Sequence, residues 1–158
     1  MHPKDMTGLQ LMQAFAQGLF PRPGISKTMP MDAQTVEHGR VIFTATANET
    51  HTNPMGGVHG GFAATVLDTV TGCATHTVLP AGESYGTTDL NIKMCRPLPF
   101  NVTVYAEGKV INAGRNLVIS EGTIRDEAGK VYAHAAATCM IIRPAAREQA
   151  TARFGSAA

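Results

Sequence analysis

The residues best suited to chemistry lie between His51 and Gly61. This stretch places Gly56, Gly57, Gly60 and Gly61 within six positions, directly before a long helical pattern. Glycine lets the backbone approach a ligand closely, and the start of a helix carries about half a positive charge. The spacing lacks both the P-loop pattern with its lysine and the GxGxxG pattern, so it disfavours a phosphate cradle. An oxyanion site at Gly60 is the better interpretation.

Asp68 is the second candidate, because it interrupts an otherwise apolar helical pattern that runs from Val58 to about Val78. The pattern predicts a largely buried helix. Burying a carboxylate without partners is costly, so Asp68 either pairs with another group in a solvated crevice or acts in catalysis. The adjacent glycine-rich helix start favours catalysis.

The spacing of these two candidates predicts a dimer. Gly60 and Asp68 are eight positions apart, which in a helix means about 12 Å along the axis. A catalytic base or nucleophile acts within about 3 Å of its target. We therefore expect the Asp68 that serves a given Gly60 to come from a second copy of the helix, antiparallel across a two-fold axis.

The remaining periodicities predict the elements that position these residues. Residues 9–20 have helical spacing and end at Pro21, which indicates a short N-terminal helix packed as a lid or flank. Alternating and β-branched runs then predict five strands, at residues 40–47, 87–94, 101–110, 117–124 and 131–142. One strand before the helix and a meander of four strands after it indicate an α+β fold in which an antiparallel sheet covers the helix.

Composition narrows the class of protein. The chain has 158 residues, 44% of them hydrophobic, which suits a single core. We expect an N-terminal helical extension over 1–30, the main domain over 31–143 and a flexible tail over 144–158. A net charge of +1 argues against nucleic-acid binding. The three widely spaced cysteines, the lack of a signal-peptide core and the lack of about 20 consecutive apolar residues predict a cytoplasmic protein without membrane contact.

The run His-x-Asn-x-x-Gly-x-Val-His-Gly-Gly from His51, with Asp68 eight residues after Gly60, resembles the hotdog-fold acyl-CoA thioesterases of the phenylacetic acid degradation (PaaI-like) type. Residues 87–97 and 114–142 resemble strands of the same family, and the likeness covers about residues 36–142. It implies a hotdog fold, in which an antiparallel sheet of five to six strands wraps a long central helix. The N-terminal helix would be an addition to that fold.

The resemblance also implies a function: hydrolysis of aryl or short- to medium-chain acyl-CoA thioesters to a free acid and coenzyme A. The sites would be shared within a homodimer, with two dimers joined as a homotetramer. The Gly60 N–H would polarise the thioester carbonyl, and Asp68 of the facing subunit would act as nucleophile or general base. Asn53 would position the carbonyl or water, Thr87 would orient Asp68 or hold the water, and His59 matches the motif histidine.

Several assignments stay open at this point. His59 also suits a helix cap, Asn53 an Asx turn, and a one-residue register shift would exchange Thr87 with Thr88. A Cys73–His76 dyad is a less favoured nucleophile. No metal site is expected, and no cofactor beyond the coenzyme A of the substrate. The remaining candidate substrate contacts are Gly61, Thr88 and three basic residues that could meet the phosphates of coenzyme A, namely Lys93, Arg96 and Arg115.

Two other functions fit the same residues. A hotdog hydratase or dehydratase would use a histidine such as His59 as its base, but the helix aspartate and the Asn53 loop suit it less well. A non-catalytic acyl-CoA-binding module would need the same pocket without a competent carboxylate, so Asp68 argues against it.

Overall fold

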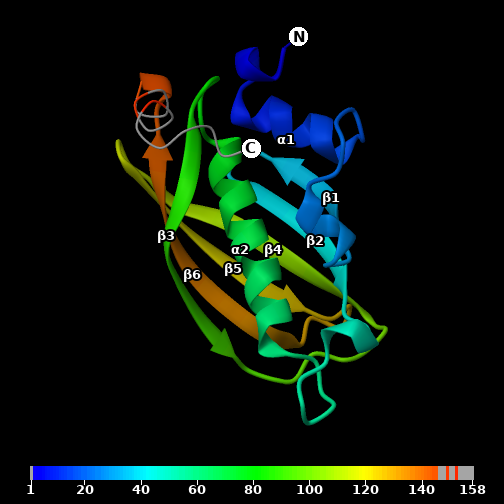
Figure 1. The fold of residues 1–158 in the computed structure, drawn as a ribbon. Coiled ribbons are helices and arrows are strands. Elements are labelled where there is room, and N and C mark those ends of the chain that lie inside the picture. The colour runs from blue at the N-terminus through cyan, green and yellow to red at the C-terminus, as the bar shows by residue number, and fades with distance from the viewer. Residues whose placement is uncertain (1, 146–148, 150–151, 153–158) are drawn as a thin grey trace.

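The computed structural model of the chain describes residues 2–145, 149 and 152, and its main feature is one antiparallel sheet curved around a single long helix (Figure 1). The helix, α2, spans Gly60–Thr77. The sheet has six strands in the order β1-β2-β4-β5-β6-β3. Their bounds are Met31–Glu37 for β1, Arg40–Thr46 for β2, Ser84–Met94 for β3, Thr103–Ala113 for β4, Leu117–Arg125 for β5 and Val131–Ile142 for β6. The predicted α+β hotdog architecture is confirmed.

Two details of the predicted sheet are wrong. β1 was not expected: its alternation is broken by a register shift between Ala33 and Thr35, which hides the strand pattern. The four strands after the helix do not form a meander either, because β3 pairs with β6 at the sheet edge and not with β4. The segment after Met94 carries Pro97 and Pro99 and crosses the end of the sheet, where Phe100 bridges to Ala47 beyond β2.

α2 lies close to the sheet because two strands present glycine to it. A Cβ on Gly108 of β4 would lie 2.0 Å from the Val70 carbonyl oxygen, and one on Gly122 of β5 would lie 3.1 Å from the Leu67 side chain. Only glycine allows the first approach. The helix face that is buried here carries the centre of the core, including Phe62, Val66, Leu67, Val70 and Ala74. Burying such side chains stabilises the fold by about 1.5–3 kcal/mol each.

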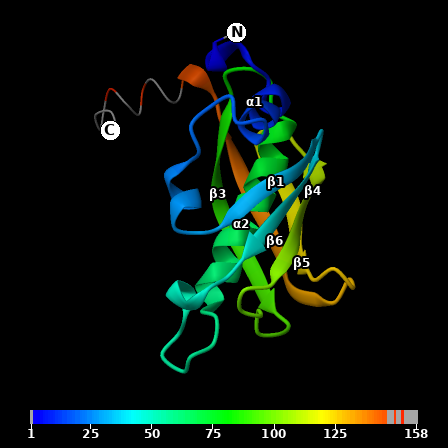
Figure 2. The same cartoon turned by 90° about the vertical axis from the view of Figure 1, so that its right-hand side faces the viewer.

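The N-terminal segment packs on this domain. It contains two short 3-10 turns, η1 (Pro3–Asp5) and η2 (Gly24–Lys27), and between them helix α1 (Gly8–Ala16), which starts with a Thr7–Gln10 capping box. α1 sits at the C-terminal end of α2 (Figure 2). There the Gly8 N–H donates to the Leu79 carbonyl oxygen at 3.0 Å. The predicted helical flank is thus present, while the division into three regions stays a prediction.

Two expectations concern the ends of the chain and membranes. Most of the predicted flexible tail, 144–158, lies outside the described residues. Across the described part of the chain, no helix is long and apolar enough to cross a bilayer.

Candidate active site

One face of α2 is left uncovered by the described residues, in the gap between β3 and the N-terminal segment (Figures 1 and 2). Gly60, Gly61 and Asp68 are exposed on this face, and Ala64 and Thr65 beside them are half-buried. Asp68 is therefore exposed in a single chain, although the helix that carries it is largely buried. No strand of the sheet covers this side of α2, so the carboxylate faces solvent.

Asp68 is held by a specific partner on the edge strand. The Thr87 hydroxyl donates a 2.9 Å hydrogen bond to Asp68 Oδ1. A bulge in β3 settles which of the two threonines does so, because the register with β6 shifts between Thr87 and Asp89. Thr88 is the extra residue of this bulge, and its hydroxyl donates to the Thr138 carbonyl oxygen at 3.1 Å. Thr87 therefore faces the helix and Thr88 does not.

The helix start leaves one donor free. His59 is the N-cap of α2, and its Nδ1 accepts from the Gly61 N–H at 2.8 Å. The capping alternative for His59 is the arrangement that the structure has, and it occupies the N–H of Gly61. Among the described residues, the Gly60 N–H donates to no acceptor. It is thus free to bind an incoming oxygen at the positive end of the helix dipole.

Asn53 shapes the loop before this helix. Its Oδ1 accepts from the N–H groups of Met55 at 2.9 Å and Gly57 at 3.1 Å, which is the Asx-type turn considered for it. These two bonds fix the orientation of the amide. Its Nδ2 donates to no atom of the described residues, so this group can still donate to a substrate carbonyl or a water.

His51 anchors the other end of the same loop. Its Nδ1 accepts from the Asn48 N–H at 3.0 Å, and its Nε2 lies 2.7 Å from the Thr28 carbonyl oxygen. A ring that accepts at one nitrogen and donates at the other is a neutral imidazole. His51 therefore ties the glycine-rich loop to the N-terminal segment.

The three basic candidates do not gather at one place. Lys93 and Arg96 are exposed near the C-terminal end of β3, where Met94 approaches Gly60 and the Arg96 guanidinium donates to the Val131 carbonyl oxygen. Arg115 lies in the β4–β5 turn at the other end of the sheet, since Leu117 next to this turn pairs with Met140. Within one protomer, Arg115 is therefore separate from Lys93 and Arg96.

The Cys73–His76 dyad has little support. Burial and, after it, the negative charge of Asp68 together raise the pKa of the Cys73 thiol to about 12. Burial lowers the pKa of His76, and no hydrogen bond joins the two side chains among the described residues. A thiol that stays protonated at neutral pH is a poor nucleophile.

The described residues also hold no group of three or more His, Cys, Asp or Glu side chains placed to bind a metal ion.

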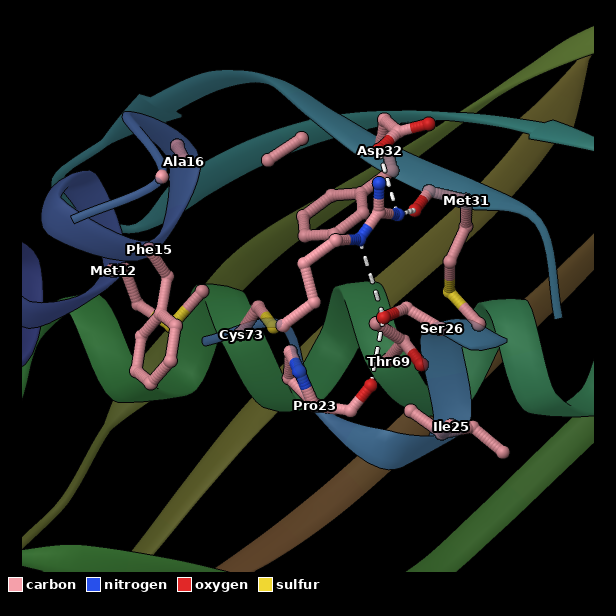
Figure 3. A pocket seen from close by; sticks show the side chains of 14 residues that line it. Met12, Phe15, Ala16, Pro23, Ile25, Ser26, Met31, Asp32, Thr69 and Cys73 are labelled. Carbon is pink, nitrogen blue, oxygen red and sulfur yellow. Dashed lines mark hydrogen bonds and ion pairs between the residues drawn. The ribbon is translucent and has the colours of Figure 1, made fainter. Parts of the chain in front are cut away.

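A hollow lies on the flank of α2 that faces the N-terminal segment, and the sequence alone did not predict it (Figure 3). Thr69 and Cys73 of α2 form its floor. The sequence carried one related signal, the apolar stripe of the N-terminal helix that includes Phe15. In the structure the Phe15 side chain stays partly exposed. The stripe thus indicated a flank, but not the space beneath it.

The sequence profile of the thioesterase superfamily matches residues 55–147, which include Gly60, Asp68 and Thr87. The chain belongs to the thioesterase superfamily. The predicted enzyme class is thereby confirmed.

Three relatives of this thioesterase illustrate the likeness. A Saccharolobus solfataricus protein provisionally named an esterase is 30% identical over 122 residues, which are 75% of this chain and 84% of that protein. A provisionally named thioesterase from Ralstonia eutropha, related to phenylacetic acid degradation, is 28% identical, with a TM-score of 0.75 over 82% of this chain and 98% of the other. A Streptococcus mutans protein solved with acetyl-CoA shares the fold at 22% identity, with a TM-score of 0.66 over 72% of this chain and 89% of its own.

The resemblance to thioesterases of the phenylacetic acid degradation type is thus confirmed for this thioesterase. Its fold agrees with that assignment.

Proposed function

We propose that this thioesterase hydrolyses acyl-CoA thioesters at sites that two protomers share. The observation that carries the proposal is the Asp68–Thr87 pair, held at 2.9 Å on an uncovered helix face that also presents the free Gly60 N–H. α2 is continuous between Gly60 and Asp68, so about 12 Å of helix separates them in one chain. A second α2, antiparallel on this face, would bring Asp68 of one protomer to Gly60 of the other.

The chemistry requires no further protein group. The thioester oxygen accepts from the Gly60 N–H, which stabilises negative charge as the carbonyl carbon becomes tetrahedral. Asp68 either attacks that carbon directly or removes a proton from an attacking water. The C–S bond then breaks, the thiolate of coenzyme A leaves and takes up a proton, and water supplies the oxygen of the acid product. Thr87 holds the Asp68 carboxylate in one orientation throughout.

Other residues have supporting roles in this proposal. Asn53 Nδ2 donates to the substrate carbonyl or the attacking water, and His59 shapes the helix start through its cap. Lys93 and Arg96, near the Gly60 end of α2, are the favoured contacts for the phosphates of coenzyme A; Arg115 would reach them only from another protomer. That the S. mutans relative binds acetyl-CoA supports a coenzyme A ester as the substrate class.

The proposal also includes the oligomeric state of the protein and its location in the cell. A homodimer is needed to complete each site, and we expect two dimers to join as a tetramer in the cytoplasm.

The hydratase alternative is weaker, because His59 Nδ1 already accepts a hydrogen bond from the Gly61 N–H. The binding-module alternative leaves the ordered, solvent-facing Asp68 carboxylate without a purpose.

The test measures thiol released from a panel of aryl, short-chain and medium-chain acyl-CoA esters. Wild type should release thiol, and Asp68→Asn should lower kcat by at least about a hundredfold with little change in substrate binding, because the lost interaction belongs to the transition state. Glu127→Gln makes the same chemical change at an exposed turn and should leave turnover unchanged. Equal turnover of Asp68→Asn and wild type would refute the role of Asp68.

Sharing of the site has its own test. Asp68→Ala and Asn53→Ala proteins, each inactive alone, should recover activity after their subunits are exchanged, since some heterodimers then hold one intact site. If the mixture shows no thioesterase activity after subunit exchange is confirmed, each subunit holds a complete site of its own.

A further inference from the structure

A cavity of about 320 Å³ lies between the N-terminal segment, β1 and α2 (Figure 3). Met12 and Phe15 of α1 cover one side, Ile25 of η2 another, and Met31 of β1 and Phe43 of β2 a third. Phe15 and Ile25 are both more than a third exposed. Large apolar side chains that line a hollow and stay partly exposed mark a surface suited to an apolar ligand.

The charged groups of this cavity neutralise each other. Arg22 and Asp32 form a 2.7 Å ion pair, and the Arg22 guanidinium also donates to the Met31 carbonyl oxygen at 3.0 Å. Both charged side chains are more than half exposed, so they stand at the rim. The pair links the segment before η2 to β1 across the cavity. An uncharged, apolar guest therefore suits the interior.

The cavity lies next to the Asp68 face of α2. Its floor residue Thr69 directly follows Asp68, and Cys73 lies one turn further along. The Asp68 carboxylate is near enough to raise the pKa of the Cys73 thiol. Thr65 lies one turn before both Asp68 and Thr69, so a small, half-buried side chain stands beside the carboxylate and the cavity floor.

We propose that this cavity receives the acyl group of the substrate, and that the N-terminal segment sets the largest acyl group the enzyme accepts. The proposal rests on the proposed function, since it assigns the part of the thioester beyond the reacting carbonyl. A dry apolar cavity of about 150 Å³ holds benzene. A space about twice that size suits an arylacetyl or medium-length alkyl group, and an acetyl group would leave most of it empty.

The N-terminal segment that covers the cavity is held firmly enough to select acyl groups by size. A Cβ on Gly8 would lie 1.7 Å from the His76 carbonyl oxygen, so α1 touches the end of α2 directly. The Gln13 side-chain amide donates to the Val36 carbonyl oxygen at 3.2 Å. Together with the Arg22–Asp32 pair, these contacts anchor both ends of the segment that roofs the cavity.

The experiment fills the cavity with larger side chains and measures how the enzyme's preference among acyl-CoA esters changes. Ala16→Phe adds a ring at the end of α1, where Ala16 is exposed and lines the cavity, so the risk to folding is small. Ala33→Leu fills the cavity from β1 as a second variant. Ala128→Phe, in the exposed β5–β6 turn, adds the same ring far from the site. For each protein, kcat/KM is measured with acetyl-, octanoyl- and phenylacetyl-CoA.

Both filling variants should lower kcat/KM for octanoyl- and phenylacetyl-CoA by at least about tenfold while acetyl-CoA changes by about twofold or less, because each buried methylene contributes about fourfold. Ala128→Phe should match wild type with all three esters. If wild type hydrolyses the esters but neither folded filling variant changes the ratio between them, the acyl assignment is overturned and the hydrolase function stands.

A binding measurement separates the two proposals. Calorimetry with non-hydrolysable thioether analogues of the same three esters reports acyl recognition without turnover. Tighter binding of the octanoyl than the acetyl analogue in wild type, lost in both filling variants, supports the cavity even if no ester is cleaved. Equal binding of both analogues by wild type would overturn it.

Discussion

The Thr87 hydroxyl donates to Asp68 Oδ1 at 2.9 Å and so joins the sheet edge to the middle of the central helix. Two features of β3 bring this about: the bulge after Thr87, and the close packing of Tyr85 over Gly72 one turn along α2. The carboxylate is held by its own chain but lies about 12 Å along the helix from its own Gly60. In the proposed function, one protomer orients the carboxylate and another completes the site.

Loss of this hydrogen bond should reduce catalysis without unfolding the protein. Thr87→Val keeps the shape of the side chain and removes the donor, so Asp68 loses its fixed orientation. We expect kcat to fall by about ten- to a hundredfold while KM changes little. Thr87→Ser restores the hydroxyl and should recover most of the activity. If Thr87→Val and Thr87→Ser turn over equally, Thr87 does not orient Asp68.

The free N–H at Gly60 can be removed by a substitution that leaves the start of the helix nearly unchanged. Proline is well tolerated at the first helical position, and His59 before it has the extended backbone that a following proline requires. Gly60→Pro should therefore fold and lower kcat by about a hundred- to a thousandfold, as loss of an oxyanion donor does. Gly60→Ala keeps the N–H and crowds only the flexible end of Met94. A Gly60→Pro enzyme as active as Gly60→Ala would exclude this N–H as the oxyanion donor.

Gly72 should be intolerant of any side chain. A Cβ there would lie 2.4 Å from the Tyr85 hydroxyl oxygen and under 3 Å from two ring carbons. Gly72→Ala should destabilise the fold by about 1–3 kcal/mol and, by displacing β3, also lower turnover. Thermal unfolding and thiol release measure the two effects. Combined with Tyr85→Phe, the loss should be less than additive, because the closest contact is gone; simple additivity would argue against this clash.

His76 should make stability depend on pH. Its pKa is lowered by burial in the folded protein, while the unfolded chain has the ordinary value of about 6.5. Below that pH the unfolded state binds more protons, so the free energy of unfolding should fall as pH drops through 6.5 toward the folded pKa. His76→Gln should flatten this slope in denaturant unfolding between pH 7.5 and 5. His38→Gln, at an exposed turn, should not; an unchanged slope in His76→Gln would refute the assignment.

Much of the fold could be predicted because it depends on local patterns. The apolar stripe of α2 and the alternation in β2, β5 and β6 are set by residues close in sequence. β1 was missed because its bulge breaks the alternation, and the partner of β3 was wrong because strand order depends on where a connection crosses the sheet. The cavity was missed for a similar reason, since Met12, Phe43 and Cys73 meet only in the folded chain.

The sequence by itself determined the motif, the spacing of Gly60 and Asp68 along one helix, and from these the family; the second protomer at the site stays a prediction. Helical rise per residue is constant, so a distance along one helix can be counted in residues. Only the tertiary structure decided that Thr87 rather than Thr88 holds Asp68, that the Asp68 face is open, and that a roofed cavity lies beside it. These depend on contacts between distant segments, where a single bulged residue changes which side chain faces the helix.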